Sequence, residues 1–291
     1  MKTKILFLGL LLTMLTISCN KDDNDNGGNA NFSSDEAKVN AKIDAANDDV
    51  SDIVEGQFNA TMMPAGRLSE VSAATSSLGN CPNVTRLPEG ELTEGTPVTI
   101  TVDFGNTGCE RPNGNILQGQ IIITFTYQPS ATAHTINYQF VDFYHNAIKF
   151  TGNKTFTRTM TGGDSSHPIV QMNMDMNATF PDGRVFHRVG TRIREIIQGF
   201  NTPLDFSDNI YQVTGNWTTT FPNTTVQTST ITTPLHVKLL CIQEQKPLLV
   251  QGVITFDRNG NTATLDYGNG NCDNLAVFTI NGVSYNIVIG N

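Results

Sequence analysis

Apolar and polar residues alternate along most of the chain from residue 97 onward. A period of two is typical of a strand that buries one face and leaves the other in solvent. The alternation is clearest in three runs: Ile121, Ile123, Phe125 and Tyr127; Ile136, Tyr138 and Phe140; and Met172, Met174, Met176, Ala178 and Phe180. Turn sequences separate such runs at hairpin spacing, namely Pro181-Asp182-Gly183, Asn259-Gly260-Asn261 and Asn281-Gly282. We therefore predict a mainly β protein with about a dozen strands in one large antiparallel meander, built as a curved sheet, a sandwich or an open barrel.

One amphipathic helix is expected before the strands, over residues 33–56. Ser33 and Glu36 have the spacing of a capping box, which marks a helix N-terminus. The apolar residues that follow fall on a single helical face, namely Val39, Ile43, Ala46, Val50, Ile53 and Val54. Gly56 is expected to end the helix. The helix should lie against the sheet or cover an open end of it, and we interpret its many acidic residues as a solvated face.

A repeat divides the β region, residues 57–291, into two related parts. The stretch 99–109 recurs without gaps as 262–272, and both copies fit T-x-T-(V/L)-D-(F/Y)-G-N-x-x-C. Each copy has another cysteine upstream at a similar distance, so the symmetry favours the disulfides Cys81 with Cys109 and Cys241 with Cys272 over the other two pairings. The segments 81–109 and 241–272 would then be closed loops. Within the copies, Asp103 and Asp266 precede a Gly-Asn turn, and a structural role in that turn is favoured over a calcium or catalytic role.

The N-terminus is typical of a secretory signal. Lys2 and Lys4 precede an uncharged, largely apolar run over residues 5–17, which at about 13 residues is too short to remain as a membrane span. The stretch 15–19 ends in Ser18 and Cys19 and resembles the lipobox of bacterial lipoproteins, although Thr16 stands where that family usually has leucine. The resemblance implies that residues 1–18 are removed, that Cys19 receives a lipid, and that the protein is attached to the outer membrane.

Residues 19–32 form a polar, acidic stretch that is expected to be an extended tether. It begins with Lys21, Asp22 and Asp23, which resemble the surface-export signal of Bacteroidota lipoproteins. This resemblance implies a location on the cell surface. The alternative is a solvated linker without a signal.

The C-terminal run Asp266-Tyr267-Gly268-Asn269 with Cys272-Asp273-Asn274 resembles a group of Bacteroidota lipoproteins that have no assigned activity. The resemblance implies a surface-lipoprotein setting, and it assigns no catalytic residue.

The net charge of the chain excludes one class of partner. The chain holds 18 basic and 27 acidic residues, and loss of Lys2 and Lys4 with the signal peptide takes its net charge from −9 to −11. Nucleic acid is therefore not expected as a partner.

A basic stripe is the main candidate for ligand binding. Arg184, Arg188, Arg192 and Arg194 share one face of an expected strand, while Val185, Val189 and Ile193 take the other. We expect the arginines to project outward, where they could bind a glycan that carries carboxylate or phosphate groups. The alternative is that they pair with acidic residues on neighbouring strands. His187 falls on the apolar side and is expected to be partly buried.

No catalytic motif or metal-ligand spacing is found, and the five histidines are scattered, so the chain is expected to be neither an enzyme nor a metal or cofactor protein. Met172, Met174 and Met176 could bind copper(I), but a face that continues into Ala178 and Phe180 is more simply core. The sequence therefore predicts a surface-exposed outer-membrane lipoprotein with a non-enzymatic binding or structural β domain, whose partner is a glycan or an envelope protein. The alternatives are a periplasm-facing carrier of a lipid or other apolar molecule, with the helix as its lid, and a surface enzyme that acts on glycans.

Overall fold

The computed structural model describes residues 32–62, 78, 81–162, 166–202 and 205–289. Cys19, Lys21, Asp22 and Asp23 lie outside the described residues, as do the predicted signal peptide and nearly all of the predicted tether. The described residues all belong to one compact unit, Asn31–Asn291.

The described residues form one long helix, two short 3₁₀ helices and fourteen strands, which run in chain order as follows: α1 (Ser34–Met62), β1 (Asn83–Leu87), β2 (Thr96–Asp103), β3 (Cys109–Glu110), β4 (Ile116–Tyr127), β5 (Ala133–His145), β6 (Ile148–Met160), β7 (Pro168–Thr179), β8 (Val185–Gln198), η2 (Phe206–Asp208), β9 (Ile210–Thr220), β10 (Val226–Lys238), η3 (Leu239–Ile242), β11 (Leu249–Arg258), β12 (Asn261–Asn269), β13 (Leu275–Ile280) and β14 (Val283–Val288).

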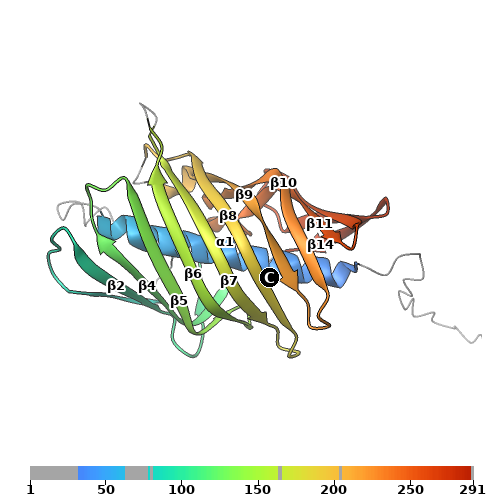
Figure 1. Ribbon diagram of the computed structural model, residues 1–291, viewed down its shortest axis with the longest axis horizontal. Coiled ribbons are helices and arrows are strands. Elements are labelled where there is room, and N and C mark those ends of the chain that lie inside the picture. The colour runs from blue at the N-terminus through green and yellow to red at the C-terminus, as the bar shows by residue number, and fades with distance from the viewer. Residues whose placement is uncertain (1–31, 63–77, 79–80, 163–165, 203–204, 290–291) are drawn as a thin grey trace, which may run out of the picture. The chain divides into compact units, whose positions relative to one another are not determined.

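The predicted antiparallel meander is confirmed (Figure 1). Apart from the short β3, which pairs with β4, each strand pairs with its neighbours in chain order, from β1 at one edge to β14 at the other. The three predicted turns lie between β7 and β8, between β11 and β12, and between β13 and β14. Of the three forms expected, the sheet takes the curved one and does not close on itself.

Irregular positions help to curve the sheet. At Gly119 the pairing of β4 with β5 shifts register, and the backbone takes a φ of 77°, which favours glycine. A Cβ atom there would lie 2.1 Å from the carbonyl oxygen of Asp142. Gly252 makes the same kind of close approach to Pro234, at a register shift between β11 and β12. Such bulges bend a strand and increase its twist, so they help the sheet to wrap round.

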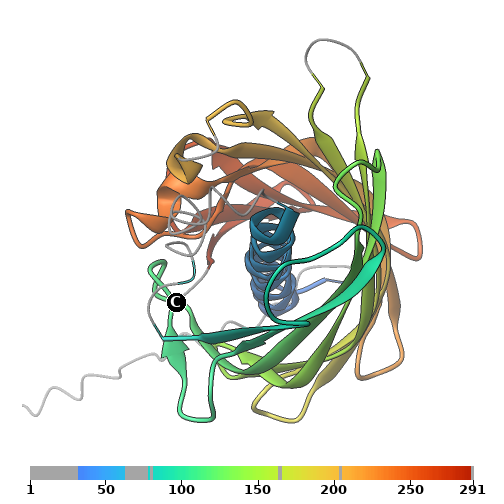
Figure 2. The same ribbon diagram turned by 90° about the vertical axis from the view of Figure 1, so that its left-hand side faces the viewer.

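The helix α1 runs along the inside of this curve (Figure 2). Its hydrogen-bond partners come from widely separated parts of the sheet, from Arg111 before β4 to Tyr267 on β12. The capping box is confirmed, because the backbone N–H of Ser33 donates to Glu36 Oε2 and that of Glu36 donates to Ser33 Oγ, each at 3.2 Å. No helix of the described part of the chain has both the length and the apolar character needed to cross a bilayer.

Two expectations about α1 are wrong. The helix passes through Gly56 and ends at Met62, because Phe58 is buried and packs edge-on against Phe125 with ring centres 5.0 Å apart. That packing outweighs the low helix propensity of one glycine. The acidic residues do not form a solvated face either, since these five are all buried: Asp44, Asp48, Asp49, Asp52 and Glu55.

Three other sequence predictions are confirmed. Met172, Met174 and Met176 lie in the core, at most 4 % exposed, and Tyr138 donates a hydrogen bond to the sulfur of Met172 at 3.6 Å. Both disulfides are present, Cys81 with Cys109 and Cys241 with Cys272. The two copies of the repeat also make the same turn. The carboxylates of Asp103 and Asp266 accept hydrogen bonds from the backbone of Gly105 and Gly268, each at 2.8 Å. Their role is the structural one.

Candidate functional site

Three of the four arginines of the stripe face the interior. Arg188, Arg192 and Arg194 on β8 are 0 %, 2 % and 5 % exposed and point toward α1, whereas Val189 and Ile193 on the opposite face are 42 % and 39 % exposed. The expectation that these arginines project outward is therefore wrong. The alternation separated the two faces of the strand correctly. The prediction assumed that the apolar face of the strand is the buried one. The charged face is the inner face, because acidic residues of α1 lie inside the sheet and pair with the arginines.

The carboxylates of α1 hold these arginines. Arg188 Nη1 and Arg192 Nη2 both donate to Asp44 Oδ1, at 2.6 and 2.7 Å. Arg194 Nη1 donates to Glu55 Oε1 at 2.6 Å. The arginines pair with a helix that is distant in sequence and not with acids on the neighbouring strands. Arg184 alone stays at the surface, where its Nε donates to Asp182 at 2.7 Å.

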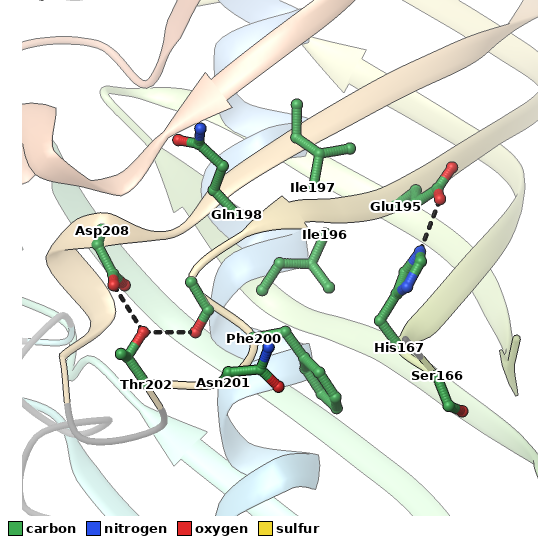
Figure 3. Close-up of a pocket in the computed structure, with 11 residues that line it drawn as sticks. Ser166, His167, Glu195, Ile196, Ile197, Gln198, Phe200, Asn201, Thr202 and Asp208 are labelled. Atoms are coloured by element: carbon green, nitrogen blue, oxygen red, sulfur yellow. Dashed lines mark hydrogen bonds and ion pairs between the residues drawn. The ribbon is translucent and has the colours of Figure 1, made fainter. Parts of the chain in front are cut away.

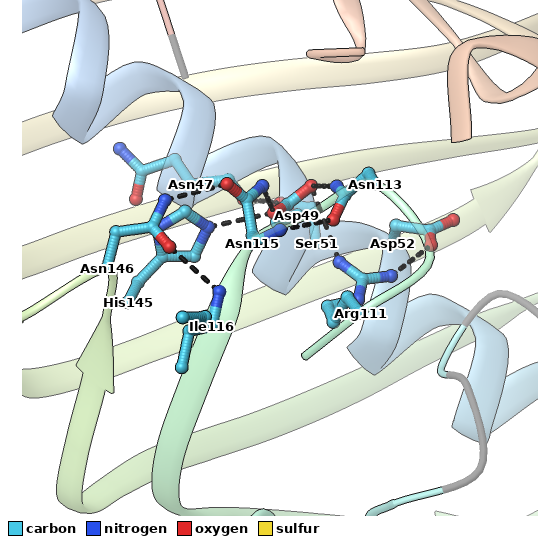
Figure 4. Close-up of polar contacts among 10 residues, drawn as sticks. All are labelled: Asn47, Asp49, Ser51, Asp52, Arg111, Asn113, Asn115, Ile116, His145 and Asn146. Atoms are coloured by element: carbon cyan, nitrogen blue, oxygen red, sulfur yellow. Dashed lines mark hydrogen bonds and ion pairs between the residues drawn. The ribbon is translucent and has the colours of Figure 1, made fainter. Parts of the chain in front are cut away.

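A second part of the network lies around Asp49 (Figure 4). Its carboxylate accepts hydrogen bonds from His145 Nε2 at 2.8 Å, from Asn115 at 2.6 Å and from Asn113 at 3.0 Å. Arg111 lies 3.4 Å from it and also donates to Asp52. Burial alone would raise the pKa of Asp49, but the charge of Arg111 and the hydrogen bonds outweigh burial, so the pKa is lowered. Asp49 is therefore held as a carboxylate.

Two other buried groups are poised near neutral pH. Burial raises the pKa of Asp48 to about 6, against the opposing charges of Arg192 and Arg194. Burial, together with the charges of Arg192 and Arg188, lowers the pKa of Lys154 to about 7. Lys154 Nζ donates to the amide oxygen of Asn47 at 2.5 Å and reaches no carboxylate among the described side chains. The space inside the curved sheet is thus occupied by α1 and lined by ionisable groups. It is not an apolar cavity.

An open pocket of about 530 Å³ lies at one end of the sheet, between the β6–β7 and β8–β9 connections (Figure 3). His167 and Glu195 meet on one side of it, with Nε2 2.7 Å from Oε1. On another side Asp208 Oδ2 accepts a hydrogen bond from Thr202 Oγ1 at 2.6 Å. The ring of Phe200, which is 38 % exposed, lines the pocket between these pairs.

Local backbone geometry explains how this pocket forms. Gly199 directly follows β8 with a φ of 85°, and a Cβ atom there would lie 2.1 Å from the side-chain oxygen of Asn209. Only glycine allows the chain to turn this closely. After the turn, Asp205 caps the short helix η2 by accepting a hydrogen bond from the backbone of Ser207 at 3.0 Å. The cap sets the position of Asp208.

No sequence pattern marks these pocket residues as a site. His167 is the last residue of the β6–β7 connection. Glu195 lies near the end of β8, and Phe200 and Asp208 lie in the β8–β9 connection, so no local spacing joins these residues to His167. Strand pairing brings them together, since Ile169 lies opposite Glu195. No group of three or more His, Cys, Asp or Glu side chains in the described ranges is arranged to hold a metal ion. His187 is half-buried on the apolar outer face of β8, as expected, and bonds Asp175 at 2.7 Å.

Comparison of the chain with protein-family models, with curated proteins and with solved structures finds no match.

Proposed function

We propose that this chain is a lipid-anchored lipoprotein of the outer membrane, exposed on the cell surface, whose β unit binds a neutral, hydroxyl-rich ligand such as a glycan in the pocket beside Phe200. The observation that carries the proposal is the pocket itself. Its volume of about 530 Å³ lies within the range of small-molecule sites in proteins.

The chemistry of the pocket favours a sugar. Glu195 and Asp208 supply carboxylate oxygens that accept hydrogen bonds from hydroxyl groups, and the amides of Gln198 and Asn201 can both donate and accept. The ring of Phe200 offers an apolar surface for the carbon face of a sugar. None of the described residues that line the pocket is Lys or Arg, so the site suits a neutral glycan better than an acidic one. The buried arginine stripe cannot supply the positive charge that an acidic glycan would need.

Two further features support this proposal. The lipobox ending in Cys19 and the residues Lys21, Asp22 and Asp23 resemble signals that place lipoproteins on the bacterial surface, where glycans are plentiful. Inside the sheet, α1 occupies the space that an apolar cargo would need, which supports a binding domain over a carrier.

Binding can be tested with an array of neutral and acidic oligosaccharides. Phe200→Ala should weaken binding of the best ligand by about tenfold, or about 1.4 kcal/mol. Val189→Ala is the matched control, because it removes an apolar side chain of similar exposure from the outer face of β8, the strand that precedes Phe200, away from the pocket. Equal loss in both variants, or no binding of any neutral glycan, would contradict the proposed pocket function.

Anchoring is tested separately. Cys19→Ser should abolish partition into detergent, and normal membrane attachment of this variant would contradict lipidation. Protease added to intact cells should cleave the native protein, while a variant with Lys21, Asp22 and Asp23 replaced by Ala should be lipidated but protected. Because compact β domains resist proteases, an antibody against the folded unit is the necessary second probe of intact cells.

One observation favours a second candidate function, hydrolysis of glycans. Glu195 and Asp208 are two carboxylates that line one cleft, and glycoside hydrolases use a pair of carboxyl groups that flank the bond they break. Incubation with the oligosaccharides that bind should then release new reducing ends. Glu195→Gln and Asp208→Asn should each stop that release without abolishing binding. If native protein binds a glycan and leaves it intact, the site is a binding site.

A further inference from the structure

The inner face of β9 and β10 carries a polar patch that the ion pairs with α1 do not use. It consists of Trp217 and Thr219 on β9 and of Gln227 and Ser229 on β10. Thr219 lies opposite Gln227, and Trp217 lies opposite Ser229, so the four side chains are direct neighbours on one face. None of them is more than 1 % exposed.

Each side chain of this patch has a polar atom that finds no hydrogen-bond partner among the described residues: Trp217 Nε1, Thr219 Oγ1, Gln227 Nε2 and Ser229 Oγ. The Nε atom of Arg188, which lies opposite Thr219 on β8, is in the same condition. A buried polar group without a partner is destabilising, and native proteins contain few of them. Several in one connected patch therefore indicate a bound group that serves them all.

The types of these atoms define that group. The indole nitrogen, the amide nitrogen and the guanidinium Nε can only donate hydrogen bonds, and the two hydroxyls can donate as well. The bound group must therefore accept several hydrogen bonds at once. A water molecule meets this need poorly, because it also has two hydrogens of its own to place. A monatomic anion accepts from every side and needs no acceptor.

The charges nearby agree with an anion. Arg188 and Arg192 share a single carboxylate oxygen of Asp44. Arg192 has a second carboxylate partner in Asp48, at 3.4 Å, whereas Arg188 has Asp44 alone among the described carboxylates. The positive charge of Arg188 would therefore stabilise an anion beside its Nε atom.

The helix α1 covers the patch. Arg258, which donates to Gln227 at 2.8 Å, also bonds Glu36, while Arg188 bonds Asn40. The patch between those two arginines therefore faces the part of α1 that holds Ala37 and Ala41, both buried and both small. We propose that the inner face of β9 and β10 binds a small monovalent inorganic anion of the halide class, enclosed between the sheet and α1.

Crystals of the full mature chain grown in sodium bromide test this directly. An anomalous bromide peak is expected within hydrogen-bonding distance of Trp217 Nε1, Thr219 Oγ1 and Ser229 Oγ. Density that fits water molecules only, or side chains turned so that they bond one another, would overturn the proposal.

Thermal unfolding provides an independent measurement. Gluconate is the reference anion, because it is too large to be enclosed between the sheet and α1. At equal ionic strength, the unfolding midpoint of the native protein should be about 3 °C higher in chloride or bromide than in gluconate. The near-isosteric double variant Thr219→Val with Ser229→Ala should lose this halide-specific shift. Thr218→Val, on the outer face of β9, is the matched control and should keep it. Equal midpoints of native protein in halide and gluconate would contradict an anion site even if the double variant failed to fold.

Discussion

Asp44 and Arg188 are 144 residues apart in the chain, yet Arg188 Nη1 lies 2.6 Å from Asp44 Oδ1 and neither side chain is exposed. The contact joins α1 to the middle of the sheet. Further pairs join α1 to β6, β11 and the segment before β4. Buried charges are tolerated only when they are paired and hydrogen-bonded, so these contacts specify where the helix lies within the curve.

The pair between Glu55 and Arg194 should be strongly coupled in stability. Arg194→Met leaves the carboxylate of Glu55 buried without its cation, and this should lower the free energy of unfolding by about 3–5 kcal/mol. Adding Glu55→Leu removes the unpaired charge and should restore much of that loss. Chemical denaturation of the two single variants and the double variant measures the coupling.

Arg184→Gln is the control for that series. Arg184 and Asp182 form an ion pair in the turn just before β8, but both side chains are exposed. No measurable change in unfolding is expected. If Arg194→Met were as mild as Arg184→Gln, the buried network would not be what positions α1.

Two glycines should respond in opposite directions to alanine. A Cβ atom at Gly190 would lie 2.4 Å from the Cα and Cβ atoms of Trp217, so Gly190→Ala should destabilise the fold by about 1–3 kcal/mol or more. Gly56 lies within α1 and has nothing within 4 Å of its Cβ position. Gly56→Ala should therefore stabilise by about 0.5–1 kcal/mol through helix propensity. Thermal unfolding of both variants is the measurement, and destabilisation by Gly56→Ala would argue against a continuous helix to Met62.

Lys154 should make the protein more stable as the pH rises above neutrality. Its pKa is about 7 in the folded state and 10.5 in the unfolded state, so between these values the unfolded chain binds the extra proton. Stability from this group therefore increases over that window, by an amount on the order of 5 kcal/mol. Lys154→Met removes the effect. Its advantage over the native protein should be largest at or below pH 7 and shrink toward pH 10, and a constant difference would contradict the lowered pKa.

Asp48 should have the opposite dependence in the acidic range. Its folded pKa of about 6 exceeds the ordinary value of 3.8, so the folded state binds the extra proton between pH 4 and 6. The contribution of this group to stability falls as the pH rises through that window, by an amount on the order of 3 kcal/mol. Asp48→Asn should gain stability relative to the native protein from pH 4 to pH 6. Urea denaturation at several pH values checks this, and a relative loss over the same range would show the sign to be wrong.

Local pattern alone was enough for a large part of the fold. The alternation of residues such as Met172 and Met174 predicted strands, and glycine-containing turns predicted where they reverse. The repeat predicted both disulfides, because two copies of one local structure place their cysteines alike. These features depend on neighbours in sequence, through backbone geometry and the period of a strand.

Only the tertiary structure decided which face of the sheet is inside and what fills it. A strand that carries Arg188 on one face and Val189 on the other has two possible orientations, and burial of the apolar face is the usual one. The acidic face of α1 reverses that choice, because Asp44 and Glu55 can be buried only beside cations that β8 supplies. No local spacing links residues 44 and 188, or His167 and Glu195 in the pocket, since each pair meets only when the sheet has formed. The sequence by itself determined the strands, their turns and the cysteine pairs, whereas the charged interior and the pocket depend on long-range packing and on the pairing of charges removed from water.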